Sequence, residues 1–242
     1  DLISLMKALP FPWTALLKCD VKDWASWVHL DHKTLCWDWH IQPLEPLINL
    51  KHLFTNQSLL FLTGSTQNSL FKSQLELASC VLNVEVTLGG PLVQDPINLF
   101  LPTRQPLPNT EIYTQHLIDQ SRRLILGQTG ITIVLLDDLQ LRQQLASALA
   151  AEFGTRVVNE ETAPKSNGVV CCSWDWWLSH QHQLPVPTQL IAALLPLASL
   201  ESPFVAARVS SLKRDGRDWF RELLLPEALR IISQAVVPLR GS

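Results

Sequence analysis

The sequence lacks the patterns that place a chain in a membrane or in the secretory pathway. No run of about 18 apolar residues marks a transmembrane helix, and the first residues lack the basic and then apolar pattern of a secretory signal. The five cysteines are odd in number, and Cys171 and Cys172 alone lie close in sequence, in a predicted strand whose side chains alternate between two faces. We therefore expect a cytoplasmic protein with reduced thiols and no membrane partner.

Two motifs that define common enzyme classes are also missing. The 242 residues contain no Gly-x-x-x-x-Gly-Lys-Ser/Thr loop, so a Walker-type cradle for nucleotide phosphates is absent. No Gly-x-Ser-x-Gly elbow accompanies any serine, so serine-hydrolase chemistry has no support. The net charge of -3 provides no overall attraction to nucleic acid, so such contact needs a local basic patch.

The chain has enough apolar sequence, 47% of its residues, to bury a sizeable core. Buried strands are predicted at 131–136, 155–158, 168–172 and 190–195, and helices at 110–126, 139–153, 202–216, 219–224 and 226–236. Continuous β-branched runs that alternate with helices indicate an α/β fold with a mostly parallel sheet and helices on both faces.

A β-hairpin is predicted near the start of the chain. Residues 27–31 and 35–41 alternate on both sides of a short polar turn, which would place Trp37 and Trp39 on one face. Pro43 would end the second strand. We expect residues 1–46 to form an appendage and residues 47–242 to form the main domain.

The most informative stretch is residues 167–177. A short apolar run after Asn-Gly indicates a buried strand, and a polar residue at the end of such a strand is where open α/β sheets bind ligands. Ser173 and Asp175 are therefore the first site candidates. The three tryptophans at 174–177 carry too much aromatic surface for a solvent-exposed loop, so this loop should pack on the body or, less often, stack against a partner.

A second predicted strand end carries hydroxyl groups. Leu59 to Thr63 is predicted to be a buried strand that runs into Gly64, Ser65 and Thr66. Free hydroxyl and N–H groups at such an edge suit contact with phosphate or a nucleic-acid backbone. A simple helix cap by Ser65 or Thr66 explains the same residues equally well.

Three further groups of residues have weaker signals for a site: a pair of aspartates, a pair of histidines and a basic cluster. Asp137 and Asp138 follow a strand and could hold Mg²⁺ through water, but Asp138 as the N-cap of the next helix is favoured. His180 and His182 have the chemistry of zinc ligands beside the cysteine pair, but their spacing does not fit, and we expect no metal site.

A basic cluster of Lys213, Arg214 and Arg217 surrounds Gly216 and could contact phosphates. Because cations are also favoured at the C-terminus of a helix, a purely structural role explains this cluster slightly better.

Four stretches carry a resemblance to a known family. They are Leu60–Thr66, Gly130–Leu145, Val169–Trp177 and, most specifically, the tail from Leu195 to Val236. The tail has Leu-Pro, then Ser-Pro-Phe-Val, Arg208, Asp-Trp-Phe, Leu-Pro-Glu-Ala and Gln-Ala-Val in the family's order. From about residue 24 to 240 the chain resembles the C-terminal motor domain of the DinG-like helicases, the XPD-related branch of superfamily 2.

The resemblance implies a RecA-like domain that tracks single-stranded DNA. ATP and Mg²⁺ would be bound mainly by an N-terminal motor domain that is not in this chain. Thr63, Ser65 and Ser173 would line the nucleic-acid or interdomain face. Gln234 would begin the motif that senses the γ-phosphate, where an arginine finger stabilises the transferring phosphoryl group.

Departures from the family pattern weaken the expected ATP response. Arg240 lies one place early for the family's Gly-Arg-x-x-Arg motif, and Trp176 and Trp177 replace a Glu-Gly pair, which leaves Asp175 as the only acid of that loop. We expect the isolated chain to be inactive as an ATPase. The alternatives are a degenerate pseudo-helicase module that binds nucleic acid or protein, and an unrelated α/β binding protein.

Overall fold

The computed structural model describes most of the 242 residues, with several interruptions in the first half of the chain: 22–46, 58–62, 75–76, 83–86, 97–108 and 110–240. It forms two compact units that interleave in sequence. The first unit takes residues 1–86 and 198–226, and the second takes 87–197 and 227–242. The expected division into 1–46 and 47–242 stays a prediction.

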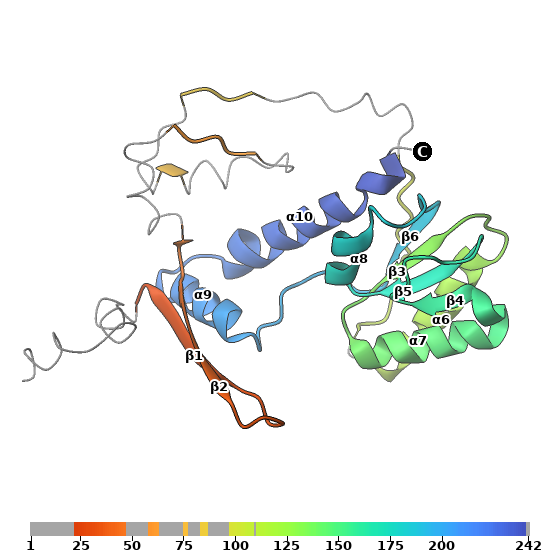
Figure 1. Cartoon of the computed structure of the whole chain (residues 1–242), viewed down its shortest axis with the longest axis horizontal. Coiled ribbons are helices and arrows are strands. Elements are labelled where there is room, and N and C mark those ends of the chain that lie inside the picture. The colour runs from red at the N-terminus through yellow and green to blue at the C-terminus, as the bar shows by residue number, and fades with distance from the viewer. Residues whose placement is uncertain are drawn as a thin grey trace, which may run out of the picture. The chain divides into compact units, whose positions relative to one another are not determined.

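The second unit contains a four-stranded parallel sheet (Figure 1). Its strands are β3 (Thr132–Leu135), β4 (Val157–Asn159), β5 (Val169–Cys172) and β6 (Gln189–Ala192), and they lie in the order β4-β5-β3-β6. Thr132 is aligned with Val169 on one side and with Gln189 on the other. The prediction of an α/β fold with a mostly parallel sheet is confirmed.

Helices cover both faces of this sheet (Figure 1). On one face, alternate strand residues pack against helices α6 (Glu111–Ile125) and α7 (Leu139–Phe153). On the other, they pack against α8 (Trp174–His180) and the C-terminal part of α10 (Leu225–Ala235). Cys171 belongs to the first core and Cys172 to the second, so the two thiols point to opposite faces as expected.

The bounds of α7 follow from its capping residues. The Asp138 side chain accepts a hydrogen bond from the Leu141 N–H at 2.8 Å, so its predicted role as the N-cap is confirmed. Gly154 ends the helix with a φ of 62° and begins the 3₁₀ turn η1 (Gly154–Arg156). This turn occupies the first two positions of the strand expected at 155–158, so β4 starts two residues later.

One predicted strand is contradicted. Residues 58–62 have no regular secondary structure, and Leu60 and Leu62 are 84% and 87% exposed. A short apolar run has no periodicity that separates a buried strand from other conformations. Thr63, Ser65 and Thr66 lie outside the described residues.

The first unit contains an antiparallel hairpin of β1 (Trp24–Leu30) and β2 (Trp37–Pro43), as predicted (Figure 1). Asp31 holds the turn, because its carboxylate accepts hydrogen bonds from the Thr34 hydroxyl at 2.7 Å and from the Lys33 N–H at 2.9 Å. These two bonds lower the pKa of Asp31.

Helix α9 (Pro203–Arg214) packs on β1, with the Phe204 ring centroid 6.3 Å from that of Trp27. Pro203 occupies its first turn, as expected. A single π-helical turn, η2 (Phe220–Leu224), then leads directly into α10, and the 3₁₀ turn η3 (Val237–Arg240) follows it. Within the described part of the chain, no helix has both the length and the apolar character needed to cross a bilayer.

Trp177 ties helix α8 to α10, and its replacement tests the packing of this core. Its side chain is fully buried and its indole N–H donates to the Ala235 carbonyl at 3.0 Å. Trp177→Phe leaves that carbonyl without a donor and opens a void, so we expect unfolding free energy to fall by about 2–4 kcal/mol. Trp176→Phe, at a partly exposed position of the same helix, should cost less than about 1 kcal/mol. Urea denaturation followed by circular dichroism measures both, and equal losses would contradict the packing described.

Candidate functional site

The carboxyl ends of β3 and β5 form the topological switch point of the sheet. From β3 the chain passes to α7 on one face, and from the neighbouring β5 it passes to α8 on the other. Open α/β sheets bind ligands at such a point. Asp137, Glu160 and Ser173 lie there, each just beyond the end of a strand.

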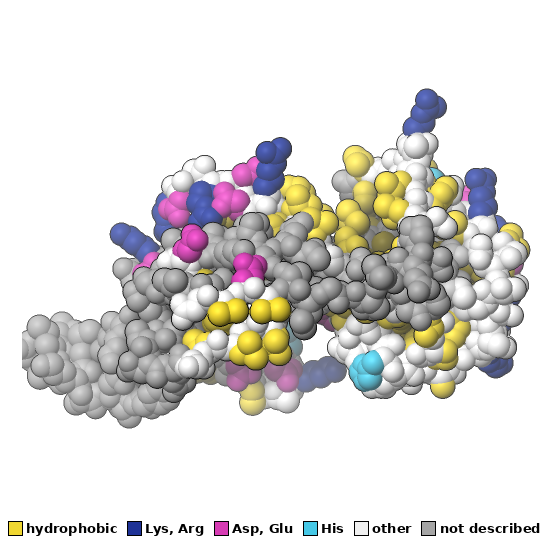
Figure 2. Space-filling view, turned by 90° about the horizontal axis from the view of Figure 1, so that it is seen from above, with side chains coloured by type: hydrophobic (Ala, Val, Ile, Leu, Met, Phe, Trp, Pro, Cys, Tyr) yellow, Lys and Arg dark blue, Asp and Glu magenta, His cyan; other side chains and the backbone are white. Residues whose placement is uncertain are grey.

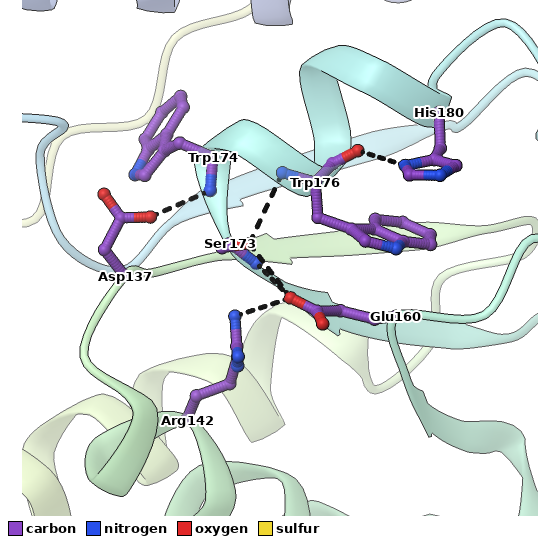
Figure 3. A network of polar contacts seen from close by, with 7 residues as sticks. All are labelled: Asp137, Arg142, Glu160, Ser173, Trp174, Trp176 and His180. Carbon is purple, nitrogen blue, oxygen red and sulfur yellow. Dashed lines mark hydrogen bonds and ion pairs between the residues drawn. The ribbon is translucent and has the colours of Figure 1, made fainter. Parts of the chain in front are cut away.

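Glu160 is the centre of a polar network at this edge (Figure 3). Its Oε1 atom accepts hydrogen bonds from Arg142 Nη1 at 2.8 Å, from Ser173 Oγ at 2.9 Å and from the Ser173 N–H at 3.3 Å. Glu160 has a φ of 47°, a left-handed conformation that is uncommon for glutamate. The Arg142 side chain is only 12% exposed, so its partner carboxylate compensates a mostly buried positive charge.

The same network caps helix α8. Ser173 Oγ accepts from the Trp176 N–H at 3.4 Å, and Asp137 accepts from the Trp174 N–H at 3.0 Å (Figure 3). Both carboxylates therefore lie at the positive end of this helix, where negative charge is favoured. The Ser173 hydroxyl already has a donor and an acceptor partner, so it serves as a cap in this arrangement.

The stretch expected to be a tryptophan-rich loop is helix α8. Trp174 and Trp177 are buried, so the packing interpretation is confirmed for these two side chains. Trp176 is partly exposed and stacks on His180 with ring centroids 4.7 Å apart. Asp175 is exposed on the first turn of α8, and its carbonyl accepts from the Ser179 hydroxyl at 2.9 Å.

The two other candidates for an ATP interface lie near the end of the chain. Gln234 is on α10, where its side-chain oxygen accepts from Arg230 Nη1 at 3.0 Å. Arg230 also binds the Glu227 carboxylate, and this hydrogen bond raises the pKa of the guanidinium. Arg240 is the last residue of η3, and its side chain lies outside the described part of the structure.

The basic cluster belongs to the first unit, and each of its three cations has a different partner. Lys213 Nζ lies 5.2 Å from the centre of the Trp219 ring. Arg214 donates to the Lys22 carbonyl at 3.3 Å, and Arg217 Nε donates to Glu222 at 2.7 Å. On the face drawn in Figure 2, basic side chains are interspersed with acidic ones.

Trp219 lies beside the basic cluster, and the sequence interpretation did not single it out. Its ring meets that of Phe220 edge-on, with centroids 6.2 Å apart, and Phe220 is 41% exposed. The available signal was the run Arg-Asp-Trp-Phe-Arg, which alternates charge with aromatic surface. Cations beside aromatic rings are the combination that binds single-stranded nucleic acid.

The cysteine pair is placed for packing. Burial raises the pKa of Cys171 to about 12, and burial also raises that of Cys172. His180 Nδ1 is bonded to the Trp176 carbonyl at 2.8 Å. Within the described ranges, no three His, Cys, Asp or Glu side chains are grouped as a metal site would require.

Comparisons with protein-family models, with curated proteins and with solved structures find no match for this chain. The α/β class therefore rests on the strand order and on the two cores that cover the sheet.

The role of Glu160 can be measured against its neighbour in sequence. Glu160→Gln removes the charge that compensates Arg142, so we expect the free energy of unfolding to fall by about 1–3 kcal/mol. Glu161→Gln makes the same chemical change at an exposed position and should alter stability by no more than about 0.5 kcal/mol. Urea unfolding of both variants provides the comparison, and an unaffected Glu160→Gln protein would show that the network contributes little.

Thiol reactivity should separate the cysteines by burial. Cys36 is exposed, whereas Cys171 and Cys172 are buried with raised pKa values, so few of their thiols ionise at neutral pH. We expect iodoacetamide to modify Cys36 in the native protein and the buried pair only after unfolding. Mass spectrometry of the peptides reads the sites, and rapid native modification of the pair would contradict the described core.

Proposed function

We propose that this chain is the second motor domain of a DinG-type ATP-dependent DNA helicase. It has a RecA-like fold, binds single-stranded DNA, and contributes one side of an interdomain ATP site without being catalytic alone. The observation that carries this proposal is the agreement between the resembling stretches and the sheet. The stretch at 130–145 forms β3 and the first half of α7, and the one at 169–177 forms β5 and the start of α8.

The polar groups at the edge of the parallel sheet suit a domain that contacts ATP without binding its phosphates itself. The first amide groups of α8 are bonded to Asp137 and Ser173, so they are already occupied by the chain's own side chains. ATP and Mg²⁺ would be held by the phosphate loop and acidic residues of the N-terminal motor domain, the partner that this proposal requires. Gln234, Arg240 and Asp175 are the residues that we assign to the interdomain side.

A second candidate, a pseudo-helicase module that binds nucleic acid or protein without ATP hydrolysis, has its own support. Gln234 is bonded to Arg230, and Ser173 to Glu160, so two of the assigned side chains are engaged within the chain. Trp176 and Trp177 also stand where the family has an acid and a glycine. A domain adapted for packing at these positions would have lost its ATP response.

The sequence that precedes Asp1 in the gene distinguishes the two candidates at little cost. A Gly-Lys-Thr phosphate loop and an Asp-Glu-x-His box there would support the motor, and the longer protein should then hydrolyse ATP faster when single-stranded DNA is added. An intact upstream motor without DNA-stimulated ATPase activity would exclude the active helicase and leave the pseudo-helicase.

DNA binding by the chain itself tests a property that the helicase motor and the nucleic-acid-binding pseudo-helicase have in common. We expect fluorescence anisotropy to show salt-sensitive binding of oligo(dT), because phosphate contacts release counterions. Changing Lys213, Arg214 and Arg217 together to Ala should weaken binding at low salt about tenfold or more, and reduce the slope of log K against log[salt] by about 2.

The matched control removes three positive charges from the other unit, at Arg122, Arg123 and Lys165. If both triple variants lose affinity equally, the effect comes from net charge and not from the basic cluster. Failure of the unaltered chain to bind oligo(dT) at low salt would exclude the nucleic-acid function.

A further inference from the structure

The turn that joins α9 to α10 carries an aromatic side chain on the surface of the first unit. Phe220 begins the π-helical turn η2, and its side chain is 41% exposed although it is large and apolar. The Asp218 carboxylate accepts hydrogen bonds from the Phe220 N–H and from the Arg221 N–H, both at 3.1 Å. These two bonds hold the backbone that carries the ring, so the turn itself fixes Phe220 at the surface.

Trp219 supports the Phe220 ring without enclosing it. The two ring planes are nearly perpendicular, at 89°, with centroids 6.2 Å apart. An edge-on neighbour can cover at most one face of a ring, so at least one face of Phe220 is not covered by Trp219. The Trp219 ring itself is in contact with Lys213, whose Nζ lies 5.2 Å from its centroid. Phe220 is therefore the ring of this pair that a planar ligand could reach.

Two positive charges lie beside this aromatic pair and are only partly compensated. The Arg221 side chain is 81% exposed, and its Nε lies 3.6 Å from the Asp218 carboxylate. This distance exceeds the roughly 2.7–2.9 Å of a charge-assisted hydrogen bond, so the ion pair holds the guanidinium loosely. The Lys213 ammonium contacts the uncharged ring of Trp219, and this contact does not neutralise its charge.

An accessible aromatic face beside cations is complementary to a ligand that has planar bases and anionic phosphates. Single exposed apolar side chains are common on protein surfaces, but the supporting ring and the neighbouring cations distinguish Phe220 from them. A stable protein partner usually needs about 800 Å² on each side, of which one partly exposed ring supplies only a small part. A single base needs no more than one ring face.

We propose that Phe220 stacks on a base of single-stranded DNA and that Arg221 contacts the adjacent phosphate. The inference rests on the nucleic-acid binding of the proposed function and deepens it, because it names the groups that hold the base and its phosphate. Neither residue belongs to the basic cluster of Lys213, Arg214 and Arg217, so their contributions are measured separately. Stacking involves no phosphate charge, so Phe220 adds affinity without adding to the salt dependence, whereas Arg221 adds to both.

The experiment measures the binding of oligo(dT) by fluorescence anisotropy for the intact chain and for Phe220→Leu, which keeps an apolar side chain but removes the ring. Loss of the stacking contact should weaken binding about tenfold and leave the slope of log K against log[salt] unchanged. Phe220→Tyr retains a stacking ring and should bind within about threefold of the intact chain. Circular dichroism confirms that each variant is folded.

The matched control for the loss of apolar surface is Leu200→Ala, which alters a side chain of the same unit that is 49% exposed. It should change affinity by less than about threefold. Arg221→Gln tests the phosphate contact, because it should weaken binding at low salt and reduce the salt slope by about 1. An unchanged slope in Arg221→Gln would overturn the role assigned to that residue.

An oligonucleotide of equal length with abasic sites in place of its bases tests the stacking with the unaltered chain. The intact chain should bind it about tenfold more weakly than oligo(dT), whereas Phe220→Leu should distinguish the two strands by less than about threefold. Equal binding of both strands by the intact chain, or equal losses in Phe220→Leu and Leu200→Ala, would overturn the stacking contact. Binding that depends on the basic cluster and not on Phe220 would overturn this inference and leave the proposed function standing, whereas no binding by the intact chain would overturn both.

Discussion

The second unit depends on covering both faces of a sheet whose strands are only three or four residues long. Such short strands expose little apolar area each, so their neighbours must supply the rest of the core. Trp174 and Trp177 provide it on one face. Their indole N–H groups each need an acceptor when buried, and they find the carbonyls of Leu194 and Ala235, both at 3.0 Å. Helix α8 thereby connects the end of β6 with α10.

This packing determines the chemistry of the sheet edge. Because the two tryptophans must enter the core directly after β5, helix α8 has to start at Trp174 with Ser173 as its N-cap, and its first amide groups need acceptors at that point. Asp137 and Ser173 provide them, and Glu160 fixes Ser173 while it compensates Arg142. The polar groups that an open α/β sheet would present to a ligand are here bonded to one another. A ligand that approached this edge would have to displace carboxylates that the helix itself favours.

Local patterns predicted the parallel sheet, the hairpin and helix 139–153, because the burial and capping of these elements depend on residues that lie near one another in sequence. These patterns failed where the structure or the role of a residue depends on a contact with a residue far away in sequence. Trp-Asp-Trp-Trp has weak helix propensity, so α8 forms because its aromatic side chains are buried. The role of Glu160 depends on partners 18 and 13 residues away, which no spacing rule identifies. Trp219 was missed because its cationic neighbour, Lys213, lies six residues earlier on α9.

The residues to which the proposed function assigns roles come from both units. The basic cluster and Trp219 belong to the unit of residues 1–86 and 198–226, whereas Ser173, Asp175, Gln234 and Arg240 belong to the unit of the parallel sheet. Trp176 and Trp177 lie in the unit that would meet ATP under the proposed function, whereas the basic cluster lies in the other unit. Under the proposed function, changes at 176 and 177 would therefore affect the response to ATP without touching the basic cluster. Because the proposed helicase and the proposed pseudo-helicase share the nucleic-acid residues, stimulation of ATP hydrolysis, and not DNA binding, is the measurement that would separate them.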